Sequence, residues 1–235
     1  GGSLVNELLQ NKVKHITLPV ASKNPFLIFW NIYKIKKLIK ELNINIIHAR
    51  SRAPAWSSYF ACKKTSCKFI TTFHGSYSNK LIFQNSKLKL WYNSIMTKGE
   101  VVIAVSEFIK NHIKKYFPKC DEQKIHLVHR GVDVEKFTIK KIVENDVSMV
   151  INKLKLPGHK KIITLPGRIS SWKGHEFLLR ALAKVKNNDF LCLIVGDGEE
   201  KFINHINDII GKLQLDNKVR LVGKFKAMNV IYFLS

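Results

Sequence analysis

Residues 164–176 read Thr-Leu-Pro-Gly-Arg-Ile-Ser-Ser-Trp-Lys-Gly-His-Glu. In this stretch an apolar run that began at Ile162 stops at a Pro-Gly pair, and an amphipathic helical pattern opens after Gly174. Two fixed positive charges, Arg168 and Lys173, lie in the turn between them. A turn from the carboxyl end of a strand to the amino end of a helix is suited to hold a diphosphate. If that diphosphate is a leaving group, the two cations would also stabilise the charge that develops on it.

Strand-like apolar runs alternate with helical patterns along the rest of the chain. Strands that alternate with helices of about ten to fifteen residues are typical of parallel sheets with right-handed crossovers. The pattern therefore predicts an α/β fold. The expected strands cover residues 13–20, 44–49, 68–74, 101–105, 124–129, 161–166, 191–196 and 218–222. The expected helices cover residues 26–42, 52–63, 86–98, 107–117, 140–154, 174–187 and 200–213, with another helix starting near 227.

The alternation is interrupted between about residues 130 and 160. A lysine-rich helical pattern and a Pro-Gly turn occupy this stretch, and Gly131 supplies a sharp exit from the preceding strand. We therefore expect two α/β domains, residues 1–135 and 161–235, joined by a junction at residues 136–160. The chain opens without Met and ends in an apolar run, so we also expect a piece of a longer protein.

Composition limits the classes of partner. The formal charge is +23, and because only six of the 40 basic residues are arginine, the other 34 are lysine. Lysines spread along the whole chain indicate a solvated surface more than a nucleic-acid-binding stripe. No apolar run reaches the ~20 residues of a membrane-spanning helix. The cysteines are scattered without metal-ligand spacing, which favours reduced thiols in the cytosol; they are Cys62, Cys67, Cys120 and Cys192.

Polar residues follow two neighbouring expected strands of the first domain. His74 ends the strand at 68–74, where ligands bind in open α/β sheets, and a histidine there could hydrogen-bond a sugar hydroxyl or simply cap the loop. His48 and Arg50 end the strand at 44–49. Arginine forms forked hydrogen bonds to anions, so this turn is a candidate for acceptor contact, and an ion pair that caps the next helix is the alternative.

Gly196 and Gly198 open the turn after the strand at 191–196. They match the start of a G-x-G-x-x-G dinucleotide fingerprint, but Lys201 replaces the third glycine and that interpretation fails. The segment is then either a tight turn that lies beside a nucleotide or a simple turn without a binding role. The chain contains no Asp-x-Asp pair, no phosphate-binding G-x-x-x-x-G-K-[ST] loop and no G-x-S-x-G motif, which argues against those metal, nucleotidase and hydrolase sites.

The helix expected at 26–42 is amphipathic and basic. Such a helix can lie on an anionic membrane, but its apolar face more often packs on its own sheet. We expect packing on the sheet through Ile28, Ile32, Ile35, Ile39 and Leu42.

Taken in order, the motifs resemble a bacterial glycosyltransferase of family 4, the retaining group with the two-Rossmann-domain GT-B architecture. They are H-A-R-S-R-A-P-A-W, T-T-F-H-G, V-I-A-V-S-E-F-I, H-R-G-V-D, L-P-G-R-I-S-S-W-K-G, V-G-D-G-E and V-R-L-V-G. The resemblance runs from near residue 1 to 235, and Gly-Arg…Trp-Lys-Gly is its most specific part. It implies two Rossmann-like domains, both incomplete in this chain.

The resemblance also implies a function. Arg168 and Lys173 would bind the diphosphate of a nucleotide-sugar donor and stabilise it as it leaves, in place of a metal ion. His74 would reach the donor sugar as the third catalytic residue, and Gly167, with the glycines of the V-G-D-G-E turn, would help bind the donor. No cofactor or metal is expected. The acceptor would be a glycan or lipid of the cell envelope, such as lipopolysaccharide, at the cytoplasmic face of the inner membrane.

Several departures keep alternatives open. The family's first strand and glycine-rich loop would precede residue 1, and its E-x7-E element would follow Ser235, so this piece is expected to be unable to complete its donor site. Arg130 stands where many members have Asn. Three other interpretations stay open: a nucleotide-sugar epimerase of the same fold, an inactive truncated remnant, and a basic nucleic-acid- or membrane-binding module. The donor nucleotide and sugar are not predicted.

Overall fold

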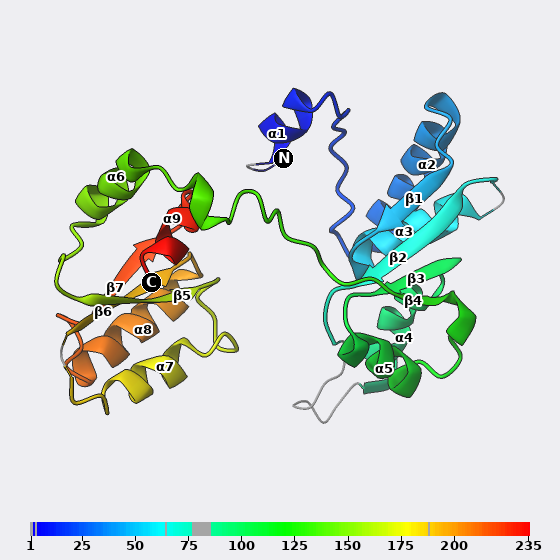
Figure 1. Cartoon of the computed structure of the whole chain (residues 1–235). Coiled ribbons are helices and arrows are strands. Elements are labelled where there is room, and N and C mark those ends of the chain that lie inside the picture. Colours follow the sequence, from blue (N-terminus) through cyan, green and yellow to red (C-terminus); the bar gives the residue numbers. More distant parts are fainter. Residues whose placement is uncertain (1, 3, 64, 77–85, 188) are drawn as a thin grey trace. The chain divides into compact units, whose positions relative to one another are not determined.

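The computed structural model describes residues 2, 4–63, 65–76, 86–187 and 189–235. Within these residues the strands form two parallel sheets, one of four strands and one of three (Figure 1). The chain divides into two units, Gly1–Gly131 and Val132–Ser235, and each unit holds one sheet. The predicted α/β class with parallel strands is therefore confirmed.

The sheet of the first unit has the spatial order β1-β2-β3-β4, the order of the strands in the sequence. Its strands are β1 (Ile46–Ala49), β2 (Lys68–Phe73), β3 (Val101–Ala104) and β4 (Ile125–Leu127). The helical segments are α1 (Val5–Gln10), α2 (Pro25–Glu41), α3 (Arg52–Cys62), α4 (Ser86–Asn93), α5 (Glu107–Tyr116) and the short 3₁₀ turns Ser94–Thr97 and Glu122–Lys124. Parallel pairing brings the carboxyl ends of β1 and β2 to one edge, with Ala49 opposite Thr71.

Local sequence signals explain where these helices begin and what they bury. Ser106 caps α5 because its hydroxyl accepts a hydrogen bond from the Ile109 N–H at 3.3 Å. Asn24 caps α2 in the same way, accepting from the Phe26 N–H at 2.9 Å, and Pro25 occupies the first turn. The expected face of α2 packs on the core through Ile32, Ile35 and Ile39. Ile28 is not part of that cluster, and Leu42 follows the last helical residue and is 40% exposed.

The strand predicted at residues 13–20 is wrong, since this segment has no strand pairing. Its Leu18 and Val20 still pack against the core, and the Asn31 side chain donates a hydrogen bond to the Pro19 carbonyl at 3.2 Å. An apolar run shows that side chains are buried, but a strand also needs a neighbour for its backbone hydrogen bonds. Pro19, which has no N–H, weakens the case further.

In the second unit β6 lies between β5 and β7 and is buried along its whole length. The strands are β5 (Lys161–Pro166), β6 (Phe190–Val195) and β7 (Val219–Gly223). The helical segments are α6 (Glu144–Leu154), α7 (His175–Leu182), α8 (Glu200–Lys212), α9 (Met228–Phe233) and a 3₁₀ turn, Ile139–Lys141. Alternate residues of β6 enter two cores: Cys192 and Ile194 face α7 and α8, and Leu191 and Leu193 face α6 and α9 (Figure 1).

The segment 136–160 contributes to this second unit. Val150 of α6 belongs to the same buried cluster as Leu193 of β6, and the boundary between the units falls between Gly131 and Val132. The helix α7 ends at Leu182, earlier than the pattern over 174–187 predicts.

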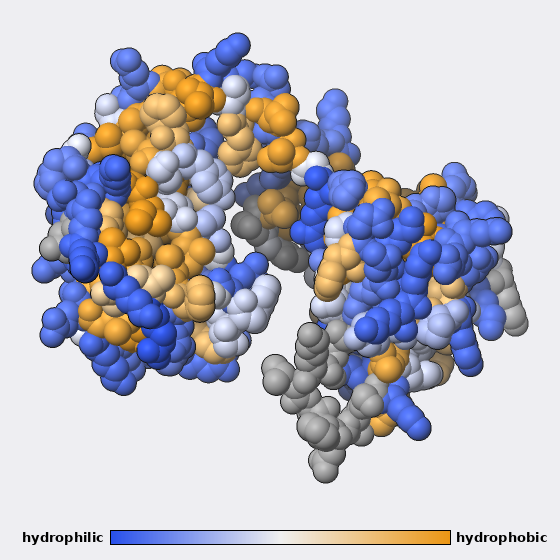
Figure 2. Space-filling model, turned by 60° about the horizontal axis from the view of Figure 1, so that its bottom comes forward, coloured by the Kyte–Doolittle hydropathy of each residue, from blue (hydrophilic) through white to orange (hydrophobic). Residues whose placement is uncertain are grey.

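Figure 2 shows hydrophilic residues over much of the first unit, on the right, and around the edges of the second unit, on the left, which also exposes a broad apolar area in this view. Among the helices in the described part of the chain, none is long and apolar enough to cross a membrane.

Candidate functional site

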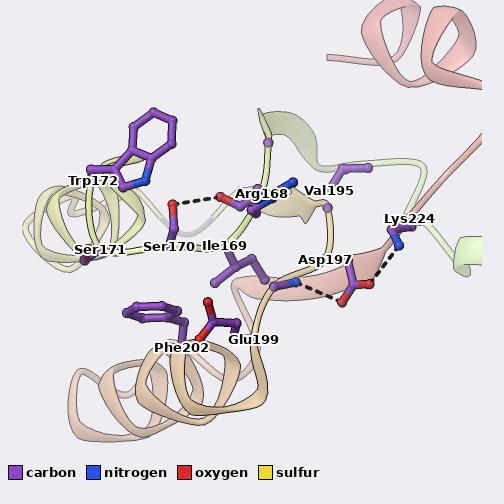
Figure 3. Close-up of a pocket in the computed structure, with 13 residues that line it drawn as sticks. Arg168, Ile169, Ser170, Ser171, Trp172, Val195, Asp197, Glu199, Phe202 and Lys224 are labelled. Atoms are coloured by element: carbon purple, nitrogen blue, oxygen red, sulfur yellow. Dashed lines mark hydrogen bonds and ion pairs between the residues drawn. The ribbon is translucent and has the colours of Figure 1, made fainter. Parts of the chain in front are cut away.

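A cavity of about 600 Å³ lies at the carboxyl edge of the second sheet, where the loops after β5, β6 and β7 meet (Figure 3). This is the edge at which open parallel sheets bind ligands. The cavity is lined by residues 167–172 from the first loop, 195–199 from the second, Phe202 of α8 and Lys224 after β7. One cavity wall therefore contains four residues that the sequence had singled out: Gly167, Arg168, Gly196 and Gly198.

Glycines allow the first two loops to run in direct backbone contact. The Gly167 N–H donates to the Val195 carbonyl and the Ile169 N–H to the Asp197 carbonyl, both at 2.9 Å. A β-carbon on Gly198 would lie 2.5 Å from the Ile169 carbonyl oxygen, and one on Gly196 would overlap the Gly167 carbonyl. These contacts leave no room for larger residues, so the pairing of β5 and β6 continues into the wall of the cavity.

The two predicted cations occupy different places in the turn. Arg168 lines the cavity, and its carbonyl accepts a hydrogen bond from the Ser170 hydroxyl at 3.5 Å. Lys173 is not among the residues that line the cavity; its Nζ lies 4.4 Å from the ring centroid of Trp172, which is 73% exposed. Gly174 follows in the left-handed region (φ 79°) and redirects the chain into α7.

An ion pair joins the second and third loops across the cavity. The Asp197 Oδ2 lies 3.1 Å from the Lys224 Nζ, while Asp197 Oδ1 accepts from the Gly198 N–H at 2.8 Å (Figure 3). The hydrogen bond from Lys224 holds the pKa of Asp197 below its usual range, and the Gly198 N–H adds to this effect. Sequence analysis missed this pair, because it depends on a contact between two separate strand ends.

A second cavity of about 340 Å³ adjoins the first between α7 and α8, and the two share Ile169, Ser170, Ser171 and Phe202. Glu176 lies in its wall. The Arg180 guanidinium donates to Glu176 Oε1 at 3.0 and 2.8 Å, and His205 contacts Oε2 at 3.3 Å. The bonds from Arg180, and then from His205, lower the pKa of Glu176.

The first unit carries a separate polar cluster around His74. The Arg50 Nε lies 3.2 Å from His74 Nε2, and the Arg130 Nη2 lies 2.8 Å from His74 Nδ1 and 3.4 Å from the His74 carbonyl. Partial burial and the positive charges of Arg50 and Arg130 lower the pKa of His74 and so favour its neutral form. A neutral imidazole accepts at only one nitrogen, so only one of the two arginines donates to the ring in a given tautomer.

His48 extends this cluster to the neighbouring strand. Its Nε2 lies 2.7 Å from the Thr72 hydroxyl, and partial burial, followed by the charge of Arg50, lowers the pKa of His48. The structure thus brings together His48, Arg50 and His74, as expected for residues at the ends of paired parallel strands. Arg130 was missed as a partner of His74. Its place directly after β4, in the same sheet, was the available signal.

Comparison with known proteins identifies the family. Residues 4–136 match Glycosyltransferase Family 4, and residues 148–235 match Glycosyl transferases group 1. The chain belongs to glycosyltransferase family 4. The two matches correspond closely to the two units of the structure.

Curated relatives and solved structures agree with this assignment. An uncharacterized glycosyltransferase of Methanocaldococcus jannaschii is 23% identical over 216 residues, which are 85% of this chain and 53% of that protein. The alpha-monoglucosyldiacylglycerol synthase of Streptococcus pneumoniae is 21% identical over 199 residues, 81% of this chain and 44% of that protein. The chain thus spans about half the length of the curated relatives that it matches.

A glycosyltransferase from Rickettsia africae is similar in structure, with a TM-score of 0.81 and 42% identity over 100% of this chain and 61% of that one. Anabaena HepE, solved in complex with UDP and glucose, has a TM-score of 0.80 at 17% identity and covers 98% of this chain and 61% of its own. Because the sequence identity is only 17%, the similarity to HepE is evidence for the fold alone. These structures confirm the GT-B class of fold, which this chain spans in part.

Proposed function

We propose that the protein is a glycosyltransferase that moves a sugar from a nucleotide-sugar donor to an acceptor with retention of configuration. The observation that carries the proposal is the cavity after β5, β6 and β7, whose glycine-packed wall includes Arg168 in the loop that leads to α7. Membership of glycosyltransferase family 4 supports it. The activity is proposed for the complete gene product, because the chain spans only part of its relatives.

Arg168 and Lys173 are proposed to hold the donor diphosphate and to stabilise its negative charge as the bond to the sugar breaks. Arg168 is suited to forked contacts with phosphate oxygens, and Lys173 supplies a mobile point charge. A preorganised group that stabilises charge only in the transition state contributes about 10²–10³ in rate. Because these two cations balance the diphosphate, we propose that turnover needs no metal ion and continues in EDTA. Loss of turnover in EDTA that Mg²⁺ restores would contradict this point.

His74 is proposed to contact the donor sugar. A neutral imidazole has one N–H and one acceptor nitrogen, so it can either donate a hydrogen bond to a hydroxyl or accept one from it. Partial burial and the charges of Arg50 and Arg130 favour the neutral form of His74, and the two guanidinium groups compete for its single acceptor nitrogen. A sugar hydroxyl would accept from the ring N–H, in place of the arginine that cannot donate to that nitrogen.

The acceptor is proposed to be a glycan or lipid of the cell envelope, reached at the cytoplasmic face of the inner membrane. Support comes from a relative whose name describes glycosylation of a diacylglycerol. Exposed aromatic residues on α2 add to it: Phe26 is 84% exposed, Phe29 73%, Tyr33 64% and Trp30 44%. Their spacing of three, four and seven residues places them on one helix face, and Lys34 lies 5.2 Å from the Trp30 ring.

The direct test supplies the complete gene product with a panel of nucleotide sugars, with and without a lipid extract as acceptor. We expect nucleoside diphosphate release from one donor that depends on the acceptor, and a product with the anomeric configuration of the donor. Conversion of a donor into its epimer without acceptor would identify an epimerase instead. If no nucleotide sugar of the panel is bound or turned over, the proposed function is wrong.

A further inference from the structure

Two arginines at the carboxyl edge of the first sheet have no acidic partner. Arg50 directly follows β1, and Arg130 lies just beyond the end of β4. Both residues are exposed, and neither forms an ion pair among the residues that the structure describes. The residues outside that described part include no Asp or Glu. An ion pair that caps the next helix, the alternative considered for Arg50, is therefore not what holds this arginine.

One imidazole brings the two positive charges together. The Arg50 Nε lies 3.2 Å from His74 Nε2, and the Arg130 Nη2 lies 2.8 Å from His74 Nδ1. In the sheet β3 lies between β2 and β4, so Arg130 reaches the histidine across the end of β3. The two guanidinium groups repel each other because their charges have the same sign, and an anion in contact with both would offset that repulsion.

Most hydrogen-bond donors of both arginines are left unused by His74. A guanidinium group carries N–H donors on each of its nitrogens, arranged as a planar fork. In the described residues Arg50 uses only its Nε, and Arg130 uses only its Nη2, which also lies 3.4 Å from the His74 carbonyl. Both Nη groups of Arg50, and the Nε and Nη1 of Arg130, therefore remain available. Paired N–H groups of this kind match the oxygens of a phosphate or a carboxylate.

No acidic group offsets these charges around the ring. Partial burial, followed by the charges of Arg50 and Arg130, lowers the pKa of His74. His48 on β1 acts in the same direction, and its own Nε2 lies 2.7 Å from the Thr72 hydroxyl. None of these groups is an acid, so the local potential is positive and attracts an oxyanion.

We propose that Arg50 and Arg130 form an oxyanion site, which binds a phosphate or carboxylate group of the acceptor. The inference rests on the proposed function, in which His74 donates to a hydroxyl of the donor sugar. That hydroxyl replaces one arginine at the ring, and the displaced guanidinium group then binds the anion. An acidic group held there lies beside His74 and orients the acceptor. The acceptor is thereby narrowed from any envelope glycan or lipid to one that carries an acidic group.

Two ligands of the proposed reaction bring an oxyanion, the donor and an acidic acceptor. The donor diphosphate has its own cations, since Arg168 and Lys173 of the second unit are proposed to balance its charge. An acidic acceptor has none assigned to it, and an oxyanion taken out of water needs a paired cation. Arg50 and Arg130 meet that need, so the site is assigned to the acceptor.

The first test is an NMR titration of the His74 ring in the complete gene product, at constant ionic strength, with glycerol 3-phosphate, glycerate and glycerol as probes. His74→Gln identifies the ring resonance by its loss. A bound anion offsets the positive charges near the ring, so an anionic probe should raise the pKa of His74, and neutral glycerol should leave it unchanged. The tighter of the two anions identifies the acidic group as phosphate or carboxylate. If neither anion moves the pKa of His74, the inference is wrong.

Variants separate ligand binding from a merely structural role. Arg50→Gln and Arg130→Gln should each weaken binding of the tighter probe about tenfold, because each removes a charged hydrogen-bond donor. Their melting temperatures should match that of the wild type, since both residues are exposed. Arg180→Gln, which changes an exposed arginine of the second unit, should leave the affinity unchanged. Affinities equal to wild type in both variants at the site would show that Arg50 and Arg130 only brace His74, and would overturn the inference.

Turnover tests the acceptor class and keeps the inference apart from the proposed function. When acidic and neutral fractions of a lipid extract are supplied separately, we expect transfer only to the acidic fraction. Arg130→Gln should raise the KM for that acceptor and leave the KM for the donor unchanged. Transfer to the neutral fraction at the same rate would contradict the inference and leave the proposed function standing. If no donor is turned over with either fraction, the proposed function fails, and the His74 titration alone decides whether the oxyanion site exists.

Discussion

Gly196 packs directly against Gly167: a β-carbon on Gly196 would overlap the Gly167 carbonyl oxygen and lie 2.7 Å from its carbonyl carbon. This contact joins the ends of β5 and β6 into one wall, and Arg168 follows immediately in that wall. The geometry of the cavity therefore depends on the absence of a side chain at position 196.

The first prediction follows from this contact. Gly196→Ala must push the two loops apart, and overpacking of this kind costs about 1–3 kcal/mol. We expect a lower melting temperature and weaker binding of pyrophosphate. Gly211→Ala is the matched control: Gly211 lies in α8, a β-carbon there meets nothing within 4 Å, and alanine should stabilise the helix by about 0.5–1 kcal/mol. Equal stability of the Gly196→Ala variant and wild type would show that the loops are not held together as described.

The second prediction concerns the electrostatics of His74. Arg130→Gln removes one of the positive charges that lower the pKa of His74, so that pKa should rise towards its ordinary value of 6.5. Titration of the His74 ring by NMR measures the change. Arg180→Gln serves as control, since Arg180 is paired with Glu176 in the other unit. A His74 pKa that does not move in the Arg130 variant would contradict the contact.

A third prediction is acid sensitivity of the fold. Burial lowers the pKa of His74, His112 and His175 below 6.5, so as the pH falls the unfolded chain binds protons before the folded chain does. The contribution of these histidines to the free energy of unfolding should therefore have its full value above pH 6.5 and decrease as the pH falls below 6.5. Melting temperatures measured from pH 7.5 to 5 test this, and His175→Leu, which removes one of these groups, should flatten the decrease. A protein equally stable at pH 5 and 7.5 would refute the prediction.

The fourth prediction addresses the aromatic face of α2. Replacing Phe26 and Phe29 together with Ser should reduce binding to vesicles rich in phosphatidylglycerol, because apolar side chains and lysines act together at an anionic surface. Phe177→Ser is the matched control, since Phe177 is 82% exposed but lies in the second unit. Co-sedimentation that is the same for wild type and the double variant would exclude this face as the membrane contact.

Much of the fold could be predicted from the sequence, because apolar runs bounded by turn residues define β1–β7 to within a few residues. The strand predicted at residues 13–20 was wrong, because an apolar pattern indicates which side chains are buried but not whether a neighbouring strand is present. Arg168 and the glycines of the cavity were also visible in the sequence, because each lies within three residues of the end of a strand and parallel strands end at one edge.

Other parts of the site could not be predicted. The Asp197–Lys224 pair and the contact between Arg130 and His74 join residues from different strand ends, and their geometry depends on loop conformation. The burial of His175, which is 2% exposed, was equally invisible in the sequence, since a histidine at the start of a helix is usually solvated. These features depend on tertiary contacts, which local sequence patterns do not predict.

The measurement closest to the central claim is the rate of nucleoside diphosphate release by the complete gene product after Lys173→Ala, with Lys184→Ala as the matched loss of one exposed charge. If Lys173 stabilises the departing diphosphate, kcat should fall about 10²–10³-fold in the first variant and stay unchanged in the second. Release at the wild-type rate by Lys173→Ala would contradict the claim that this turn takes part in catalysis.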